Sequence, residues 1–201
     1  MNFKTLIKIS RPRFWLYLGG TYLVGAVFAM NSLSDFNLQF ALHLLYFIFF
    51  ANIFLYGVND WFDRDTDRFN QKKGAKEHRL QKRDDALLRI WLIISTLLGI
   101  ALMLVWFSVP SLLLWLLWFF LSYFYSAPPI RFKARPVVDS LSNILYVVPG
   151  FLAYYQFSGV LPPWHVVIAA WAWVAAMHLF SAIPDIASDK KAHLLTTAVL
   201  F

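Results

Sequence analysis

The chain has 201 residues, of which 60% are hydrophobic and 19% aromatic, and its formal net charge is +7. This apolar share exceeds that of a soluble domain and the charged residues occur in blocks, so the composition excludes an ordinary soluble protein and predicts a polytopic membrane protein. The absence of cysteine excludes disulfides and thiolate metal sites.

Four long intervals contain no Asp, Glu, Lys or Arg: residues 14–34, 36–59, 90–130 and 140–184. A spanning helix needs about 20 apolar residues, so the first two intervals hold one span each and the last two hold two each. The expected spans cover about residues 14–30, 38–58, 87–107, 112–127, 137–157 and 164–183. We therefore predict one all-α domain over residues 1–201, a transmembrane helical bundle of about six spans with residues 192–201 as the start of a seventh.

The basic residues indicate the orientation. Of the 18 Lys and Arg side chains, 17 lie before the first span, in every second loop or after the sixth span. The other one, Arg89, lies at the start of the third span, and the other loops contain none. The positive-inside rule then places the N-terminus on the cytoplasmic side of a multi-pass protein of the inner, cytoplasmic membrane. Because topology accounts for the positive charge, membrane lipid is an expected partner and nucleic acid is not. Residues 1–13 predict a basic amphipathic segment whose apolar side chains face lipid.

An acidic cluster follows the second span. Asn59, Asp63 and Asp67 fall at successive four-residue steps, so on a helix their oxygen-bearing side chains share one face, with Asp60 beside them. Carboxylates this close repel one another unless cations bind or water screens them, and hard cations prefer oxygen ligands. The cluster therefore predicts a divalent-cation site on the cytoplasmic side.

The hydrophilic stretch at residues 60–86 is long for a simple connector, and we expect it to form a cytoplasmic cap over the cluster. Its basic side chains, Lys73 among them, are placed either to meet phosphate oxygens or to face anionic lipid headgroups.

The fourth span ends at Pro128 and Pro129, which break the helix and place Tyr125, Arg131 and Lys133 near the acidic cluster. In the fifth span we expect a structural rather than a catalytic role for Asp139.

A second acidic pair, Asp185 and Asp189, repeats the four-residue spacing after the sixth span. Two such faces meeting at one membrane surface would hold Mg²⁺ ions between them and, through the ions, a diphosphate. His178 lies seven residues before Asp185 on the same face, and we expect it to pack as a hydrogen-bonding residue rather than a ligand.

Three motifs in this order resemble the UbiA superfamily of intramembrane prenyltransferases: Asn59-Asp60-x-x-Asp63-x-x-x-Asp67, Tyr125-Ser-Ala-Pro-Pro-Ile-Arg-Phe-Lys133 and Asp185-x-x-x-Asp189. One DxxxD pair is weak evidence, whereas the ordered set is specific and the resemblance covers essentially the whole chain. It implies a helical bundle in which two Asp-rich motifs bind Mg²⁺ and a prenyl diphosphate. It also implies transfer of the prenyl group to a lipophilic acceptor, such as a carotenoid, a quinone precursor or another isoprenoid. The stretch Asn70-Gln-Lys-Lys73 is most similar to the branch that acts on carotenoids such as lycopene.

The resemblance also implies roles for individual residues. The implied metal ligands are Asn59, Asp60, Asp63, Asp67, Asp185 and Asp189. The implied catalytic residues are Asp63, Asp185 and Tyr125, with Tyr125 at the reacting end. The implied diphosphate contacts are Asn59, Lys73, Arg131 and Lys133.

Two features depart from the family pattern. Family members usually have nine spans, so we expect this chain to be C-terminally incomplete. A Gly usually follows the second motif by four residues, where this chain has His193.

Three other interpretations stay open on the sequence. A CDP-alcohol phosphotransferase also uses membrane Asp clusters with Mg²⁺, but its motif carries Gly and Arg residues that the first cluster lacks. A proton-coupled transporter would place its acids at mid-membrane rather than at the helix ends. An inactive truncated paralogue or a membrane scaffold would keep the bundle without the chemistry.

Overall fold

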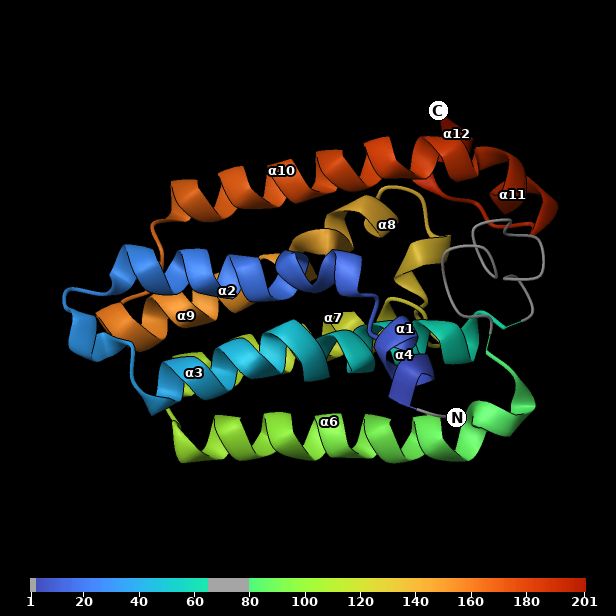
Figure 1. Ribbon diagram of the computed structural model, residues 1–201. Helices are drawn as coiled ribbons and strands as arrows, with labels where there is room; N and C mark the ends of the chain where they lie inside the picture. Colours follow the sequence, from blue (N-terminus) through green and yellow to red (C-terminus); the bar gives the residue numbers. More distant parts are fainter. Residues whose placement is uncertain (1–2, 65–79) are drawn as a thin grey trace.

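The structure, a computed structural model, describes residues 3–64 and 80–201. Its described residues form helices joined by turns, without a strand, and the helices run side by side along one long axis (Figure 1). The α-helices are α1 (Phe3–Ile9), α2 (Trp15–Ala29), α3 (Leu38–Leu45), α4 (Ala51–Phe62), α6 (Asp85–Val105), α7 (Val109–Phe124), α8 (Val138–Leu141), α9 (Val148–Ser158), α10 (Trp164–Ala182), α11 (Ile186–Lys191) and α12 (Thr197–Leu200). Short 3-10 or π-helical turns are η1 (Pro12–Phe14), η2 (Leu33–Asp35), η3 (Tyr46–Phe50), η5 (Lys82–Asp84), η6 (Phe132–Ala134), η7 (Ser142–Tyr146) and η8 (Ile183–Asp185).

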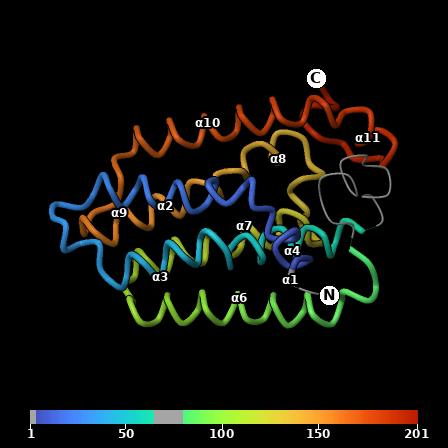
Figure 2. Tube along the Cα trace, viewed as in Figure 1, coloured from blue at the N-terminus to red at the C-terminus, as the bar shows by residue number. Residues whose placement is uncertain are grey.

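The six expected spans correspond to α2, α3–η3–α4, α6, α7, α8–η7–α9 and α10, which confirms the predicted all-α bundle. Among the described residues, three continuous helical stretches are long and apolar enough to cross a membrane: Leu38–Phe62, Lys82–Val105 and Trp164–Lys191. The trace in Figure 2 shows how the chain passes back and forth along the bundle.

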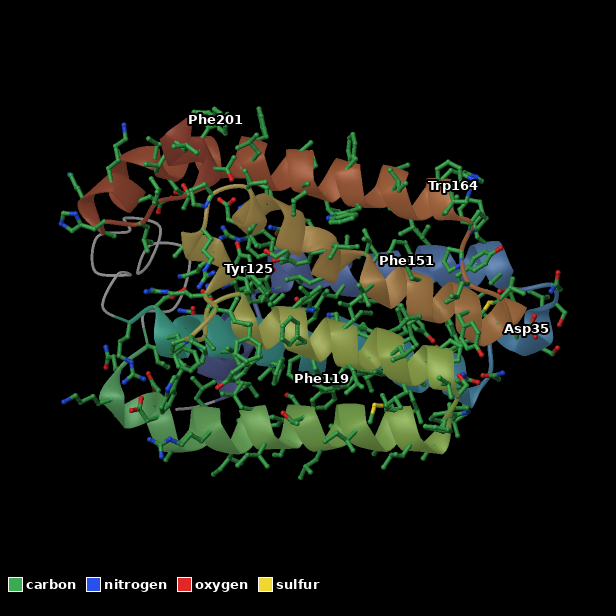
Figure 3. The ribbon with its side chains drawn as sticks, turned by 180° about the vertical axis from the view of Figure 1, so that it is seen from behind. Asp35, Phe119, Tyr125, Phe151, Trp164 and Phe201 are labelled. Carbon is green, nitrogen blue, oxygen red and sulfur yellow. The ribbon has the colours of Figure 1, made fainter. Side chains whose placement is uncertain are left out.

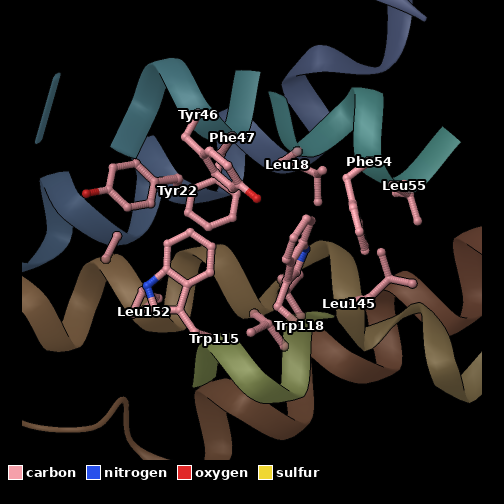
Figure 4. Close-up of a cluster of buried hydrophobic side chains, with 14 of the residues drawn as sticks. Leu18, Tyr22, Tyr46, Phe47, Phe54, Leu55, Trp115, Trp118, Leu145 and Leu152 are labelled. Atoms are coloured by element: carbon pink, nitrogen blue, oxygen red, sulfur yellow. The ribbon is translucent and has the colours of Figure 1, made fainter. Parts of the chain in front are cut away.

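Aromatic side chains fill the core between α2, α3–α4, α7 and α9 (Figure 4). Trp115 and Trp118 are each only 1% exposed, so they pack inside the protein rather than forming a belt at the membrane interface. The Trp115 ring stacks on Phe47 with centroids 5.2 Å apart, and Tyr46 meets Trp115 edge-on. Such pairs add to the stabilisation that apolar burial provides.

Helices α2 and α9 approach closely because each contributes a glycine at the contact. A Cβ atom added at Gly25 would lie 2.0 Å from the carbonyl oxygen of Gly150, and one added at Gly150 would lie 2.7 Å from the carbonyl oxygen of Thr21. Small residues allow backbones to meet in this way in membrane bundles.

One end of the bundle gathers α1, the end of α4 and α11, on the right in Figure 1. Tyr125 lies toward this end and Asp35 at the opposite one, as the side-chain view in Figure 3 shows. The first helix docks here as well. Leu6 and Ile9 of α1 are 1% and 0% exposed, so they pack against protein, in contrast to the lipid-facing segment expected from the sequence.

Candidate active site

The first acidic cluster begins where α4 ends. The helix stops at Phe62, and Asp63 follows it with its N–H donating to the carbonyl oxygen of Asn59 at 3.0 Å. Asn59 and Asp63 therefore keep their one-turn offset, although the helix ends at Phe62 and the sequence predicted that it would include Asp63. The negative end of the helix dipole opposes further carboxylates at this terminus, which explains the early stop. The predicted ligand Asp67 and the predicted phosphate contact Lys73 lie outside the described residues.

The basic residues after α7 converge on Asp63. Its side chain is 3% exposed, and it forms ion pairs with the Lys133 ammonium and, at 3.5 Å, with the Arg131 guanidinium. Arg131 has φ 47°, a left-handed conformation that is uncommon for a side chain of this kind and recurs at functional sites. Its Nε atom is buried without a hydrogen-bond partner among the described residues. Two predicted diphosphate contacts and one predicted metal ligand thus come together.

Two further members of the cluster, Asn59 and Asp60, contact a residue that the sequence did not single out. Arg11 donates to Asp60 at 2.9 Å and to the Oδ1 atom of Asn59 at 3.3 Å, and it lies 4.4 Å above the ring of Tyr56. The Asn59 amide nitrogen donates to the Ser126 hydroxyl at 2.9 Å. The positive-inside pattern put Arg11 on the side of the cluster, but no sequence signal paired it with Asp60.

The second acidic pair lies beyond α10, which contains no Asp, Glu, Lys or Arg. Asp185 ends η8 and Asp189 lies in α11. Asp185 and Lys133 both lie within electrostatic reach of the Asp189 carboxylate. Lys133 therefore contacts Asp63 and also lies within electrostatic reach of Asp189, which links the two clusters.

Asp139 has a structural environment, in line with the expectation from the sequence. Its carboxylate is 1% exposed and accepts hydrogen bonds from the backbone N–H and the hydroxyl of Thr197. It also accepts from the N–H of Ser140. These contacts fasten the segment that follows Asp189 to the start of α8.

Tyr125 directly follows the end of α7. Tyr146, Asp139 and Asp63 all lie within electrostatic reach of its hydroxyl. A phenol ordinarily titrates only near about pH 10, so the hydroxyl is protonated at neutral pH and can donate a hydrogen bond. Its ring meets His178 edge-on with centroids 6.4 Å apart, which gives His178 a packing contact.

The donor set fits Mg²⁺ in chemistry. Among the described residues, no three carboxylate or imidazole groups surround a single point. Mg²⁺ does not require such a group, because it keeps several waters and binds through one or two carboxylates together with substrate phosphate oxygens. Asn59, Asp63, Asp185 and Asp189 supply oxygen atoms, and Arg131 and Lys133 contact Asp63, which suits that mode.

The fold is that of an all-helical, membrane-type bundle with charged motifs gathered at one end. The sequence matches the UbiA prenyltransferase family over residues 18–201, and the chain belongs to this family. Its members are integral membrane proteins, and the resemblance predicted from the motifs is confirmed.

Curated relatives are named for carotenoid chemistry. The chain is 48% identical over 198 residues to the "Lycopene elongase/hydratase" of Haloferax volcanii, covering 96% of this chain and 64% of that protein. It is 45% identical to the protein of the same name from Halobacterium salinarum, covering 98% of this chain and 70% of the relative. The chain thus spans about two thirds of the length of these relatives, and the predicted likeness to the carotenoid branch is confirmed.

Solved structures share the fold. A UbiA homolog from Archaeoglobus fulgidus bound to DMAPP and Mg²⁺ matches with a TM-score of 0.81 at 29% identity, over 98% of this chain and 69% of that one. The same homolog bound to GPP and Mg²⁺ matches with a TM-score of 0.79 at 30% identity, over 98% and 69% of the two chains.

Proposed function

We propose that this chain carries the site of a Mg²⁺-dependent prenyltransferase, which transfers a prenyl group from a prenyl diphosphate to a lipophilic acceptor within the membrane. The observation that carries the proposal is the meeting of Asp63 with Arg131 and Lys133, beside the second acidic pair. Family membership and the prenyl compounds bound by the solved homologs support it. The names of the relatives favour a carotenoid such as lycopene as the acceptor.

In the proposed reaction the bond between the first prenyl carbon and the diphosphate oxygen breaks, and its electron pair leaves with the diphosphate. The acceptor alkene would then form a bond to the allylic cation, and the resulting cation would lose a proton to the released diphosphate. Lys133 and Arg131 would meet the charge that grows on the departing diphosphate, exchanging Asp63 for phosphate oxygens. Asn59, Asp63, Asp185 and Asp189 would hold Mg²⁺, which when bound neutralises diphosphate charge as a Lewis acid.

Tyr125 is placed to contribute in two ways. Its ring offers a π face that can stabilise an allylic cation, and its protonated hydroxyl can orient a substrate oxygen. The position just after α7, within electrostatic reach of Asp63, supports a role at the reacting end. We further propose that residues 1–201 act as one domain. The cap expected at residues 60–86 lies mostly outside the described residues.

The test compares host membranes that contain the chain with membranes that lack it. Each is incubated with lycopene and labelled dimethylallyl or geranylgeranyl diphosphate, with Mg²⁺ or with EDTA. The proposal expects a Mg²⁺-dependent prenylated product together with pyrophosphate release. CMP release from a CDP-alcohol would instead favour a phosphotransferase. The absence of both products, with no prenyl diphosphate binding, would favour a scaffold or an inactive paralogue.

A further inference from the structure

The N-terminal segment brings a cation into the first acidic cluster. The Arg11 side chain is 12% exposed and its partner Asp60 is 2% exposed, so the ion pair lies inside the protein. The same guanidinium also reaches Asn59 and covers the ring of Tyr56. One side chain thus contacts three residues along the last turns of α4.

The backbone around Arg11 is fixed on both sides. Before it, Ile9 of α1 is fully buried in a cluster with Leu80 and Leu88. After it, the Trp15 indole N–H donates to the carbonyl oxygen of Ser10 at 3.1 Å. Arg11 itself has φ 50°, in the left-handed region. A residue persists there only where its surroundings determine it, so the segment is built to aim this side chain.

The contacts of Asn59 set the direction of its amide. Its nitrogen donates to the Ser126 hydroxyl, which identifies the other atom as the oxygen, and Arg11 donates to that oxygen. The amide is therefore held from two sides, by the residue before η1 and by the segment after α7. The oxygen is the atom that a metal ion would use.

Asp60 points elsewhere. Successive helix residues are rotated by roughly 100°, so Asp60 leaves the face that Asn59 shares with Asp63 at its four-residue spacing. It lies instead against Arg11. A buried charge is stable only when it is paired, and separating this pair would expose two charges to a poor environment.

We infer that Arg11 is a positioning residue that orients the Asn59 oxygen, and that Asp60 is its counter-ion rather than a metal ligand. The inference rests on the proposed function and revises the ligand role that the motif implied for Asp60. Removing a side chain that contacts a metal ligand typically lowers the metal affinity by about 10- to 100-fold.

The test measures cation binding directly. The purified chain in detergent is titrated with Mn²⁺ in the presence of inorganic pyrophosphate, and bound Mn²⁺ is followed by electron paramagnetic resonance. Arg11→Gln should weaken Mn²⁺ binding by about 10-fold or more. Arg11→Lys should weaken it less, because the positive charge stays although the planar guanidinium with its several N–H donors is lost. Lys4→Gln, which changes an exposed cation of α1, should leave binding unchanged.

The Asp60 variant separates the two roles of that residue. Asp60→Asn should weaken Mn²⁺ binding less than Asp63→Asn does, by a factor of about ten or more. The double variant Arg11→Gln/Asp60→Asn should bind Mn²⁺ no more weakly than Arg11→Gln alone. If Asp60 is a ligand, its substitution will match Asp63→Asn, and Arg11→Gln will tighten Mn²⁺ binding because a competing cation is gone. Either result overturns the inference, as does unchanged binding in both Arg11 variants. Absence of Mn²⁺ binding in the unaltered chain would instead contradict the proposed function.

If Arg11→Gln does not purify as a folded protein, Arg11→Lys and Asp60→Asn still decide the question. Thermal unfolding without metal measures the structural part of each substitution. A variant that unfolds like the unaltered chain but binds Mn²⁺ more weakly has lost positioning rather than folding.

Discussion

Lys133 places its ammonium against the carboxylate of Asp63, although α6 and α7 separate the two residues along the chain. Arg131 adds a second cation to the same carboxylate. A charged group 3% exposed is thereby balanced within the protein. Under the proposed function, an incoming diphosphate would replace Asp63 as the partner of both cations.

Lys133→Gln should lower the affinity for a prenyl diphosphate by about tenfold or more, because a charge-assisted contact is lost. Binding of labelled geranyl diphosphate to the purified chain measures the effect. Lys190→Gln is the matched control, since Lys190 is an exposed cation of α11 near the same end of the bundle. An equal loss in both variants would indicate a general charge effect and contradict a specific contact.

His193→Gly should stabilise the protein. His193 has φ 53°, and a left-handed conformation costs a side-chain-bearing residue more than it costs glycine. After the larger flexibility of glycine in the unfolded chain is subtracted, the free energy of unfolding should rise by about 0.5–1 kcal/mol. Thermal or denaturant unfolding in detergent measures it.

The complementary variant is Gly159→Ala. Gly159 has φ 74°, and a Cβ atom added there would meet no neighbouring atom within 4 Å among the described residues, so only the backbone conformation is at stake. The free energy of unfolding of this variant should fall by about 1 kcal/mol.

A destabilised His193→Gly variant would show that the imidazole makes a contact that outweighs the backbone term.

Gly25→Ala should disrupt the contact between α2 and α9. The added methyl group would lie 2.0 Å from the backbone oxygen of Gly150, so the helices must separate, at a cost of about 3 kcal/mol or more. Gly20→Ala is the control, because its nearest neighbour atom would lie 3.6 Å away, in Leu16. Comparable unfolding of both variants would refute the close approach of the two helices.

Thr197→Val should destabilise the segment after the second acidic pair. The substitution removes a hydroxyl that donates to Asp139 and accepts from the N–H of Val137 at 2.6 Å. The unsatisfied buried groups should cost about 1–3 kcal/mol, whereas Thr197→Ser should be close to neutral. Unfolding curves of the two variants test whether the hydroxyl, rather than the methyl group, supports the segment.

Much of the fold could be predicted from the sequence. Charge-free intervals gave the six helical passes, because lipid tolerates neither charge nor unpaired backbone. The Pro128–Pro129 pair predicted the end of the fourth span, and α7 ends four residues before it, at Phe124. The acidic motifs predicted two clusters, and the structure describes all their members except Asp67. These features depend on local composition, which the sequence states directly.

Features that depend on contacts between distant segments could not be predicted in this way. The pairing of Arg11 with Asp60 requires the docking of α1 on the bundle, and no residue pattern reports that register. The end of α4 at Phe62 reflects the conflict between carboxylates and the helix dipole, where spacing alone favoured a longer helix. At His193 the sequence did indicate the backbone conformation. Family members normally have Gly at this position, and the backbone of His193 is left-handed.

Under the proposed function, the two acidic clusters bind a metal diphosphate together. Titration of the purified chain with geranylgeranyl diphosphate, with Mg²⁺ or with EDTA, tests it in the unaltered chain and in Asp63→Asn, Asp185→Asn and the control Asp35→Asn, whose residue lies at the opposite end of the bundle. We expect Mg²⁺-dependent binding that both cluster variants lose and the control keeps. Binding that persists without Mg²⁺, or that survives either cluster substitution, would contradict the account.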